Sequence, residues 1–380
     1  MTRPRLVMMA NNIDEVGGAQ RVVHVVAQGL AERGYPVDLV GVTPFEPRHE
    51  FVADPAFRRF VLMDEPWPAL PVGRSARNAA LAPELKARRS RLSAAAATSL
   101  AGVLDDGPAG VIVTGQLWAM EYVARVPHDD WVVIGQYHSS FEAAAAGRDL
   151  KRALDLYRDV DTFALLTPAD ADSFRRKGLN NTTWLANPLA FWPADPASGT
   201  ADEVVTYLGR LSAEKGVAYL VDAWGAIADR HPTWRLRLVG SGPDEARIRG
   251  RIAELPAGAD RVEVLPPVAD SEAELRRASM VVLPSLTEGL PLVLAEAMAL
   301  GLPCVATDCS AGVRMLAGDG ADARLVARGD AEALAAAISD LIDAPEERRV
   351  LGERARAAME PYRAERILDE WERLIADVLR

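Results

Sequence analysis

Two basic side chains near the middle of the chain are suited to binding phosphate. Arg210 and Lys215 lie in the run GRLSAEKG (209–216), directly after the apolar residues 204–208. A guanidinium is a planar fork that binds phosphate bidentately, whereas an ammonium is a compact point charge. The chain has 39 arginines and four lysines, so a lysine at this position departs from the chain's preference for arginine. The pair predicts a diphosphate site, although each residue alone is typical of a solvated helix start.

Two carboxylates follow in the segment PSLTEGLPLVLAEAMALGLP (284–303). Proline is favourable at a helix start, so Pro291 predicts a helix with Glu288 at its mouth and Glu296 between one and two turns inside it. Carboxylates accept hydrogen bonds from the hydroxyls of a sugar or a ribose. In the alternative interpretation Glu288 stabilises the helix dipole and Glu296 is exposed. The apolar neighbours of Glu296 favour a ligand contact.

A third motif is the turn GSGP (240–243), which follows the apolar run 235–239. Glycine lets the backbone approach a ligand closely, so Gly240 and Gly242 are candidates for ligand contacts. Simple turn geometry explains the same residues equally well.

The elements that would position these motifs alternate between short apolar runs and longer stretches of helical periodicity. This pattern predicts α/β architecture with parallel sheets, whose ligands bind at the carboxyl ends of the strands. The first helix is predicted at 19–33, ending at Gly34. Strands are predicted at 6–10, 37–42, 110–114, 131–137, 162–166 and 183–186, and then at 204–208, 235–239, 262–265, 280–284, 304–307 and 324–326.

The length of 380 residues favours two domains over one continuous core. Residues 189–203 are rich in Pro, Ala, Asp and Gly and lack periodicity, which indicates a linker. We therefore expect an N-terminal domain (1–190) and a C-terminal domain (204–362), and the family resemblance described below implies that the first is the acceptor-side domain and the second the nucleotide-sugar donor domain. Residues 363–380 carry one apolar stripe, which predicts a helix docked back on the N-terminal domain.

Composition excludes several classes of function. The net charge of −11 disfavours binding of nucleic acid. The two cysteines, Cys304 and Cys309, can form neither a disulfide framework nor a zinc quartet, which fits a reducing, cytoplasmic compartment. The D-x-D runs at 159–161 and 170–172 are typical of some metal-dependent transferases, but their positions favour helix capping and dipole roles. No metal or cofactor is expected, and nothing in the sequence specifies an oligomeric state.

The motifs GRLSAEKG, GSGP and EGLPLVLAE, followed by GLPCVATD, together resemble the donor site of family-4 retaining glycosyltransferases of the GT-B fold. The resemblance covers about residues 204–310. In the N-terminal half, GGAQRVV (17–23) and His138 of GQYHSSF resemble that family's acceptor-side glycine loop and active-site histidine. The resemblance implies two Rossmann-like, doubly wound domains that face each other across a cleft.

The resemblance also implies roles for individual residues. Arg210 and Lys215 would hold the donor diphosphate, and Glu296 would bind the ribose hydroxyls. Pro291 departs from the glycine often found at its position, which leaves the sugar's orientation open. The remaining implied contacts are Glu288, Gly289 and Leu290 with the transferred sugar, Gly209, Gly240 and Gly242 with the donor, Gly17 and Gly18 near phosphate and acceptor, and His138 at the reacting centre.

The implied reaction is retaining transfer of a hexose or N-acetylhexosamine from a nucleotide diphosphate sugar, with UDP-sugar favoured, to an acceptor hydroxyl. The alternatives are a nucleotide-sugar 2-epimerase, a phosphorylase, or a catalytically silent nucleotide-sugar binding module. A basic patch suggests an anionic acceptor, or an anionic surface at the inner face of the membrane. A solvated helix face explains the patch as well. Its members are Arg74, Arg77, Lys86, Arg88, Arg89 and Arg91.

Overall fold

The computed structural model describes residues 3–69, 76–197 and 203–380, with the backbone alone in 76–82. The chain divides into two compact units. Unit 1 contains Met1–Pro188 and Ala364–Arg380, and unit 2 contains Leu189–Arg363.

Unit 1 is built on a seven-stranded parallel sheet of order β3-β2-β1-β4-β5-β6-β7. Buried aliphatic and aromatic side chains such as Val7, Ile112, Tyr157 and Phe163 form its core. The strands are β1 (Leu6–Ala10), β2 (Val37–Gly41), β3 (Arg58–Val61), β4 (Val111–Thr114), β5 (Val132–Gln136), β6 (Thr162–Leu165) and β7 (Thr182–Trp184). The helices are α1 (Gly18–Glu32), α2 (Ala76–Asp105), α3 (Leu117–Val123), α4 (Phe141–Ala146), α5 (Asp149–Leu156), α6 (Pro168–Arg176) and α14 (Ala364–Val378).

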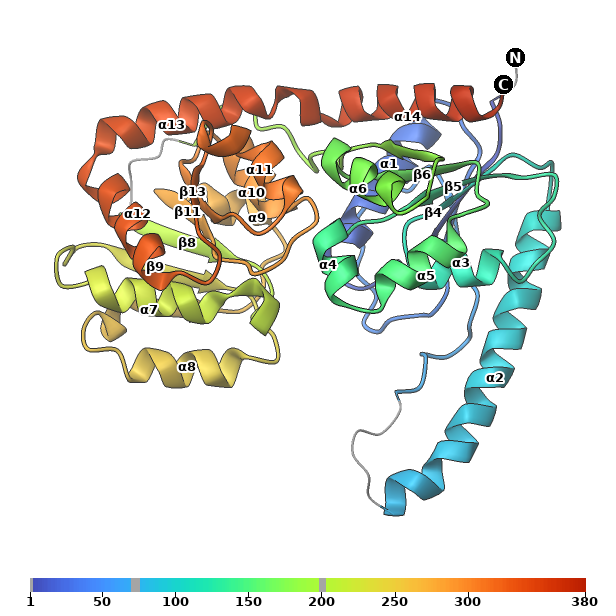
Figure 1. The fold of residues 1–380 in the computed structure, drawn as a ribbon, viewed down its shortest axis with the longest axis horizontal. Helices are drawn as coiled ribbons and strands as arrows, with labels where there is room; N and C mark the ends of the chain where they lie inside the picture. Colours follow the sequence, from blue (N-terminus) through green and yellow to red (C-terminus); the bar gives the residue numbers. More distant parts are fainter. Residues whose placement is uncertain (1–2, 70–75, 198–202) are drawn as a thin grey trace. The chain divides into compact units, whose positions relative to one another are not determined.

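Unit 2 is built on a six-stranded parallel sheet of order β10-β9-β8-β11-β12-β13. Figure 1 shows α7 and α8 on one side of this sheet and α10 and α11 on the other. Its strands are β8 (Val204–Leu208), β9 (Arg235–Val239), β10 (Val262–Leu265), β11 (Met280–Leu283), β12 (Cys304–Thr307) and β13 (Arg324–Val326). Its helices are α7 (Val217–Ile227), α8 (Glu245–Ala253), α9 (Ser271–Leu275), α10 (Leu292–Ala299), α11 (Ala311–Leu316), α12 (Ala331–Asp343) and α13 (Pro345–Ala358), with short 3₁₀ turns at Ala213–Lys215, Ala259–Arg261, Gly318–Gly320 and Glu360–Tyr362.

Both strand orders reverse direction at a central strand pair, which is the doubly wound arrangement of a Rossmann-like fold. In unit 1 the reversal lies between β1 and β4, and in unit 2 between β8 and β11. The predicted fold of two such α/β domains is confirmed. The twelve strands predicted from apolar runs are all present, and their ends differ from the predicted ones by at most two residues.

Two elements of unit 1 were not predicted. The edge strand β3 carries Arg58 and Arg59, and these arginines are paired with Asp38 and Asp14. A strand whose charges are neutralised by distant partners leaves no apolar signature in the sequence. The helix α2 runs through Pro83 without ending there, so residues 76–91, which carry most of the basic patch, are helical.

The segment predicted as a linker is bound to unit 2 where the structure describes it. The Trp192 ring lies between the guanidiniums of Arg356 and Arg363, at 4.7 and 4.0 Å from their central carbons. Arg356 also donates to the carbonyl of Pro193 at 2.8 Å. Part of the predicted linker, 198–202, lies outside the described residues.

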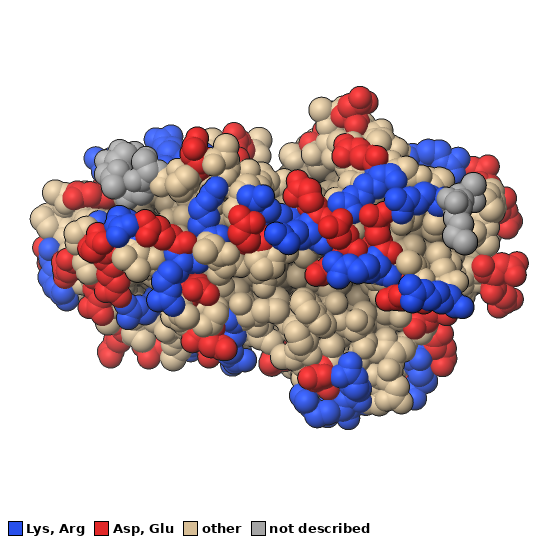
Figure 2. All heavy atoms as spheres, turned by 90° about the horizontal axis from the view of Figure 1, so that it is seen from above, with Lys and Arg blue, Asp and Glu red and all other residues tan. Residues whose placement is uncertain are grey.

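The last helix, α14, packs against α1 within unit 1. Its apolar stripe of Ile367, Leu368, Trp371 and Ile375 is buried. Arg33, the residue after α1, bonds Asp369 at 2.7 Å and Glu372 at 2.8 Å. On the face shown in Figure 2, positive and negative side chains lie interspersed, in keeping with such ion pairs.

Candidate functional site

The turn after β8 is packed against the end of β11. Gly216 has a φ of +63°, and a Cβ atom built on it would lie 2.0 Å from the carbonyl oxygen of Pro284. Glycine is therefore required at this position. The close approach brings the 209–216 run to the loop that carries Glu288, although 73 positions separate Lys215 from Glu288.

Lys215 and Glu288 form an ion pair. The distance between Lys215 Nζ and Glu288 Oε1 is 2.7 Å, and Ser285 Oγ donates to the same oxygen at 2.7 Å. The Glu288 side chain is 9% exposed and that of Lys215 is 28% exposed. A partly buried, charge-assisted pair holds both groups in fixed positions while the ammonium keeps further donors.

Arg210 lies on the same turn as Lys215. Its side chain is exposed, and its carbonyl oxygen accepts a hydrogen bond from Tyr207 Oη at 2.7 Å, which fixes the backbone. Burial tends to raise the pKa of Glu214, but the Ser212 hydroxyl and the nearby charges of Lys215 and Arg210 lower it overall. Both cations thus act on one neighbouring carboxylate, which places them in the same electrostatic environment.

The GSGP turn (240–243) packs against the 209–216 turn. Gly240 has a φ of +147°, and a Cβ atom there would lie 1.9 Å from the Gly209 carbonyl oxygen. A Cβ atom on Gly242 would lie 2.3 Å from the Leu211 carbonyl oxygen. These glycines let two backbone turns touch, which is a structural explanation for both residues. Their predicted contacts with a donor stay a prediction.

The helix α10 begins after Pro291, close to the predicted start. Glu296 lies one turn inside, is 2% exposed, and accepts a hydrogen bond from Ser271 Oγ of α9 at 3.2 Å. The exposed alternative for Glu296 is therefore wrong. Gly289 and Leu290 precede the helix, and the Gly289 carbonyl contacts Ser310 Oγ at 3.4 Å. Burial, with the Glu288 charge adding to it, raises the pKa of Cys309 to about 11, so this thiol is neutral.

Unit 1 holds the other predicted site residues at the carboxyl edge of its own sheet. Gly17 is the residue before α1 and Gly18 is its first residue. His138 follows β5, and its Nε2 would lie 3.6 Å from a Cβ atom built on Gly115. Burial lowers the pKa of His138 to about 4, against a smaller opposite effect of Asn187. The Nδ1 atom of His138 is buried and has no hydrogen-bond partner among the described residues.

The D-x-D runs carry structural contacts. Asp161 Oδ2 accepts from the Val133 amide at 2.8 Å, and Asp170 Oδ1 accepts from the Phe141 amide at 2.7 Å. The Asp170 amide is in turn capped by Thr167 Oγ1. In the described part of the chain, no group of three or more His, Cys, Asp or Glu residues is placed to hold a metal ion.

Sequence reasoning missed three residues that shape the site: Ser285, Ser271 and Tyr207. Ser285 follows the end of β11 and Ser271 begins α9, so their positions at element ends were a usable signal. Tyr207 lies within a strand, where an aromatic residue is read as core, and only the tertiary structure shows its bond to the turn.

Comparisons with known proteins agree with the fold. Residues 202–344 match the family described as glycosyl transferases group 1. An uncharacterized glycosyltransferase of Haemophilus influenzae is 28% identical over 96% of this chain and 98% of its own length. Two solved structures share the fold. TarM of S. aureus, whose mutant was solved with fondaparinux, alpha-GlcNAc-glycerol and UDP, has a TM-score of 0.81 at 13% identity and covers 98% of this chain and 99% of its own. HepE of Anabaena, solved with UDP and glucose, has a TM-score of 0.77 at 18% identity and covers 99% and 100%.

The family match covers the part of unit 2 that carries Lys215, Glu288 and Glu296, and the structural similarity extends over both units. The chain is a glycosyltransferase with the GT-B fold.

Proposed function

We propose that this enzyme transfers a hexose or N-acetylhexosamine from a UDP-sugar to an acceptor hydroxyl with retention of anomeric configuration. The observation that carries the proposal is the Lys215–Glu288 pair beside Arg210 at the carboxyl edge of the second sheet. UDP in the TarM and HepE structures supports the choice of nucleotide. The lysine and the arginine would bind the diphosphate, and Glu288 would accept a hydrogen bond from the sugar.

The chemistry would depend on charge stabilisation and positioning. Negative charge grows on the departing diphosphate as the glycosidic bond breaks, and fixed cations stabilise that charge more in the transition state than in the ground state. Lys215 is held by Glu288, so its ammonium would need little reorganisation during the reaction, and Tyr207 fixes the backbone from which the Arg210 side chain extends. The buried carboxylate of Glu296 would bind the ribose. The predicted contact of His138 with the transferred sugar stays a prediction.

A thermal-shift panel of UDP, GDP, ADP and their sugars, with and without EDTA, tests the donor site. A ligand at about a hundred times its dissociation constant adds about 2.7 kcal/mol of stability. We expect the largest shift with UDP-sugars, no effect of EDTA, and loss of the response in Arg210→Ala and Lys215→Ala. Arg249→Ala is the matched control, because Arg249 pairs with Glu245 on the exposed face of α8.

Product analysis separates the proposed reaction from its alternatives. A transferase converts the donor only when an acceptor is present, and NMR of the new linkage reports retention or inversion. A 2-epimerase would convert a UDP-N-acetylhexosamine without an acceptor. A silent binding module would show the UDP shift and no turnover. A strict requirement for a divalent cation would contradict the proposed site.

A further inference from the structure

A groove on the flank of unit 1 has no part in the site described above. It is an open depression of about 440 Å³, bounded by α2, by Trp67 in the loop after β3 and by Arg125, two residues after α3. Ser90, Ser93, Ala94 and Ala97 form its wall on α2, at positions that share one helix face. These side chains are small, so α2 cannot fill the space beside it.

One aromatic ring, Trp67, lines the groove, and an arginine stacked on an aromatic ring lies at each end. Behind the groove, Trp67 packs edge-on against Trp118 at a ring distance of 5.2 Å, and Trp118 packs against the buried Tyr122 at 5.9 Å. The Arg89 guanidinium lies 5.1 Å from the Trp67 ring, and the Arg125 guanidinium lies 5.1 Å from the Tyr122 ring. Stacking on fixed rings holds both cations in place before any ligand arrives.

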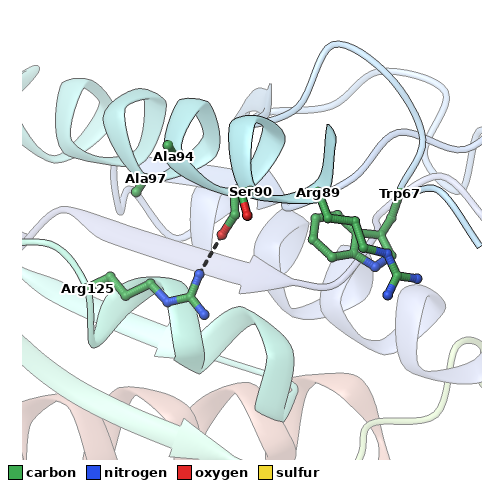
Figure 3. Close-up of a pocket in the computed structure, with 7 residues that line it drawn as sticks. Trp67, Arg89, Ser90, Ala94, Ala97 and Arg125 are labelled. Carbon is green, nitrogen blue, oxygen red and sulfur yellow. Dashed lines mark hydrogen bonds between the residues drawn. The ribbon is translucent and has the colours of Figure 1, made fainter. Parts of the chain in front are cut away.

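Hydrogen bonds further fix the two guanidiniums. Arg89 donates from Nε and Nη2 to the Pro68 carbonyl at 2.9 and 2.7 Å, and Arg125 Nη1 donates to Ser93 Oγ at 2.5 Å. Figure 3 shows Arg125 reaching toward α2 at one end of the groove and Arg89 stacked on Trp67 at the other. Each guanidinium has five N–H donors, so donors remain for a ligand.

The charges of Arg89 and Arg125 are not neutralised by the protein. Among the side chains that the structure describes, neither arginine forms an ion pair, and no carboxylate lines the groove. The neighbouring Arg88, by contrast, is paired with Glu65. In a chain of net charge −11, two unneutralised cations on one groove favour an anionic ligand.

One end of the groove lies near the carboxyl edge of the sheet in unit 1. The amide of Trp67, which lines the groove, donates to Thr43 Oγ1 at 3.0 Å. Thr43 lies in the loop after β2, and the loops that follow parallel strands lie at the carboxyl edge of their sheet.

We propose that the groove binds an oligosaccharide with negatively charged substituents as part of the acceptor. The Trp67 ring suits the apolar face of a sugar ring, Ser90 and Ser93 can bond hydroxyls, and the arginine forks bind carboxylate or phosphate groups. The identity of the ligand as acceptor rests on the proposed transferase function. Its binding to the groove does not.

The test uses the full chain and a hyaluronan tetrasaccharide, which carries carboxylates, against the same tetrasaccharide with its carboxyl groups reduced. We expect the charged form to bind about tenfold more tightly, because hydrogen bonds to charged groups are the stronger ones. Arg89→Gln with Arg125→Gln removes this difference, and Ala94→Phe blocks both sugars by filling the hollow. Arg88→Gln is the matched control and leaves binding within about twofold, as expected for a surface pair.

Three outcomes would overturn the proposal: equal binding of the two tetrasaccharides, equal effects of the Arg88 and Arg89/Arg125 changes, and full displacement of the tetrasaccharide by equimolar inorganic phosphate. The thermal shift with UDP is measured on every variant. An unchanged UDP shift together with lost tetrasaccharide binding supports the groove. Loss of the UDP response in the unaltered protein counts against the donor site alone, so failures of the two proposals are distinguishable.

Discussion

At the scale of single residues, the Lys215–Glu288 pair decides how the proposed site works. The ammonium holds a mostly buried carboxylate, and in the proposed function it also binds the donor diphosphate. A preorganised cation of this kind contributes to the transition state because it needs no rearrangement when charge develops.

Replacing Lys215 should therefore affect catalysis more than folding. We expect Lys215→Met to lower kcat/KM for the donor about 100- to 1000-fold. It should also lower the free energy of unfolding by about 1 to 3 kcal/mol, because Glu288 loses its charged partner. Steady-state kinetics and urea unfolding give the two values. Lys177→Met, at an exposed position after α6, is the control, and equal kinetic losses in both variants would contradict the assigned role.

His138 provides a second prediction at this scale. Burial lowers its pKa from 6.5 to about 4, so the unfolded chain binds a proton that the folded protein excludes between these values. The stability that depends on a neutral His138 is present above pH 6.5 and is lost as the pH falls toward 4. The loss amounts to at most about 3 kcal/mol. Urea unfolding at pH 7.5 and 5 should therefore show a larger drop for the unaltered protein than for His138→Gln. Parallel pH profiles for the two would exclude this origin.

The site could be predicted from the sequence only in part, and the reason is visible in these residues. The residue types of Arg210, Lys215, Glu288 and Glu296 predict phosphate and hydroxyl binding, and these roles stay predictions. The direct contact between Lys215 and Glu288 depends on β8 lying beside β11, and strand order is absent from local periodicity. Tyr207 was missed because an aromatic residue in a strand is expected in the core, and Ser271 because its place at a helix start was not used.

At the scale of elements, the 209–216 turn, which carries Arg210 and Lys215, depends on glycines where its backbone contacts the backbone of the GSGP turn. Gly240→Ala would place a Cβ atom 1.9 Å from the Gly209 carbonyl oxygen and at a left-handed φ. We expect a loss of about 1 to 3 kcal/mol and a weaker UDP thermal shift, because the backbone under Arg210 must move.

Gly250→Ala is the opposing control within the same unit. Gly250 lies inside α8, and a Cβ atom there meets no atom within 4 Å. Alanine is the better helix former, so this change should add about 0.5 to 1 kcal/mol and leave the UDP shift unaltered. If Gly240→Ala binds UDP like the unaltered protein, the turn is not a support for the site.

The type of an element could be predicted from the sequence where the whole element is buried. Strands such as β4 and β12 are continuous apolar runs buried on both faces, so the sequence states their type. The edge strand β3 and the long helix α2 violate local rules, with arginines in one and a proline in the other. Ion pairs with Asp38 and Asp14 compensate in β3.

At the scale of the whole molecule, the chain returns to unit 1 after completing unit 2. The helix α14 covers α1, and Gly29 of α1 has no room for a side chain beside Leu368. Unit 1 is therefore assembled from both ends of the chain, whereas Arg210, Lys215, Glu288 and Glu296 all lie in the continuous stretch Leu189–Arg363.

Removing residues 364–380 should therefore destabilise unit 1, although the rest of unit 1 is far from this segment in sequence. We expect faster hydrogen exchange in α1 and β1, because the apolar face that α14 covers becomes exposed, while peptides of β8 and β11 keep their protection and UDP still raises the melting temperature. Trp371→Ala tests the same contact in the full chain. Trp371 is 1% exposed, so its loss should cost about 3 to 5 kcal/mol, whereas Trp184→Ala, at 44% exposure, should change stability by less than about 0.5 kcal/mol. If α14 stabilises unit 1 alone, the truncation changes hydrogen exchange in α1 and leaves UDP binding intact. Loss of UDP binding in the truncated chain, or unchanged exchange in α1, would contradict this role.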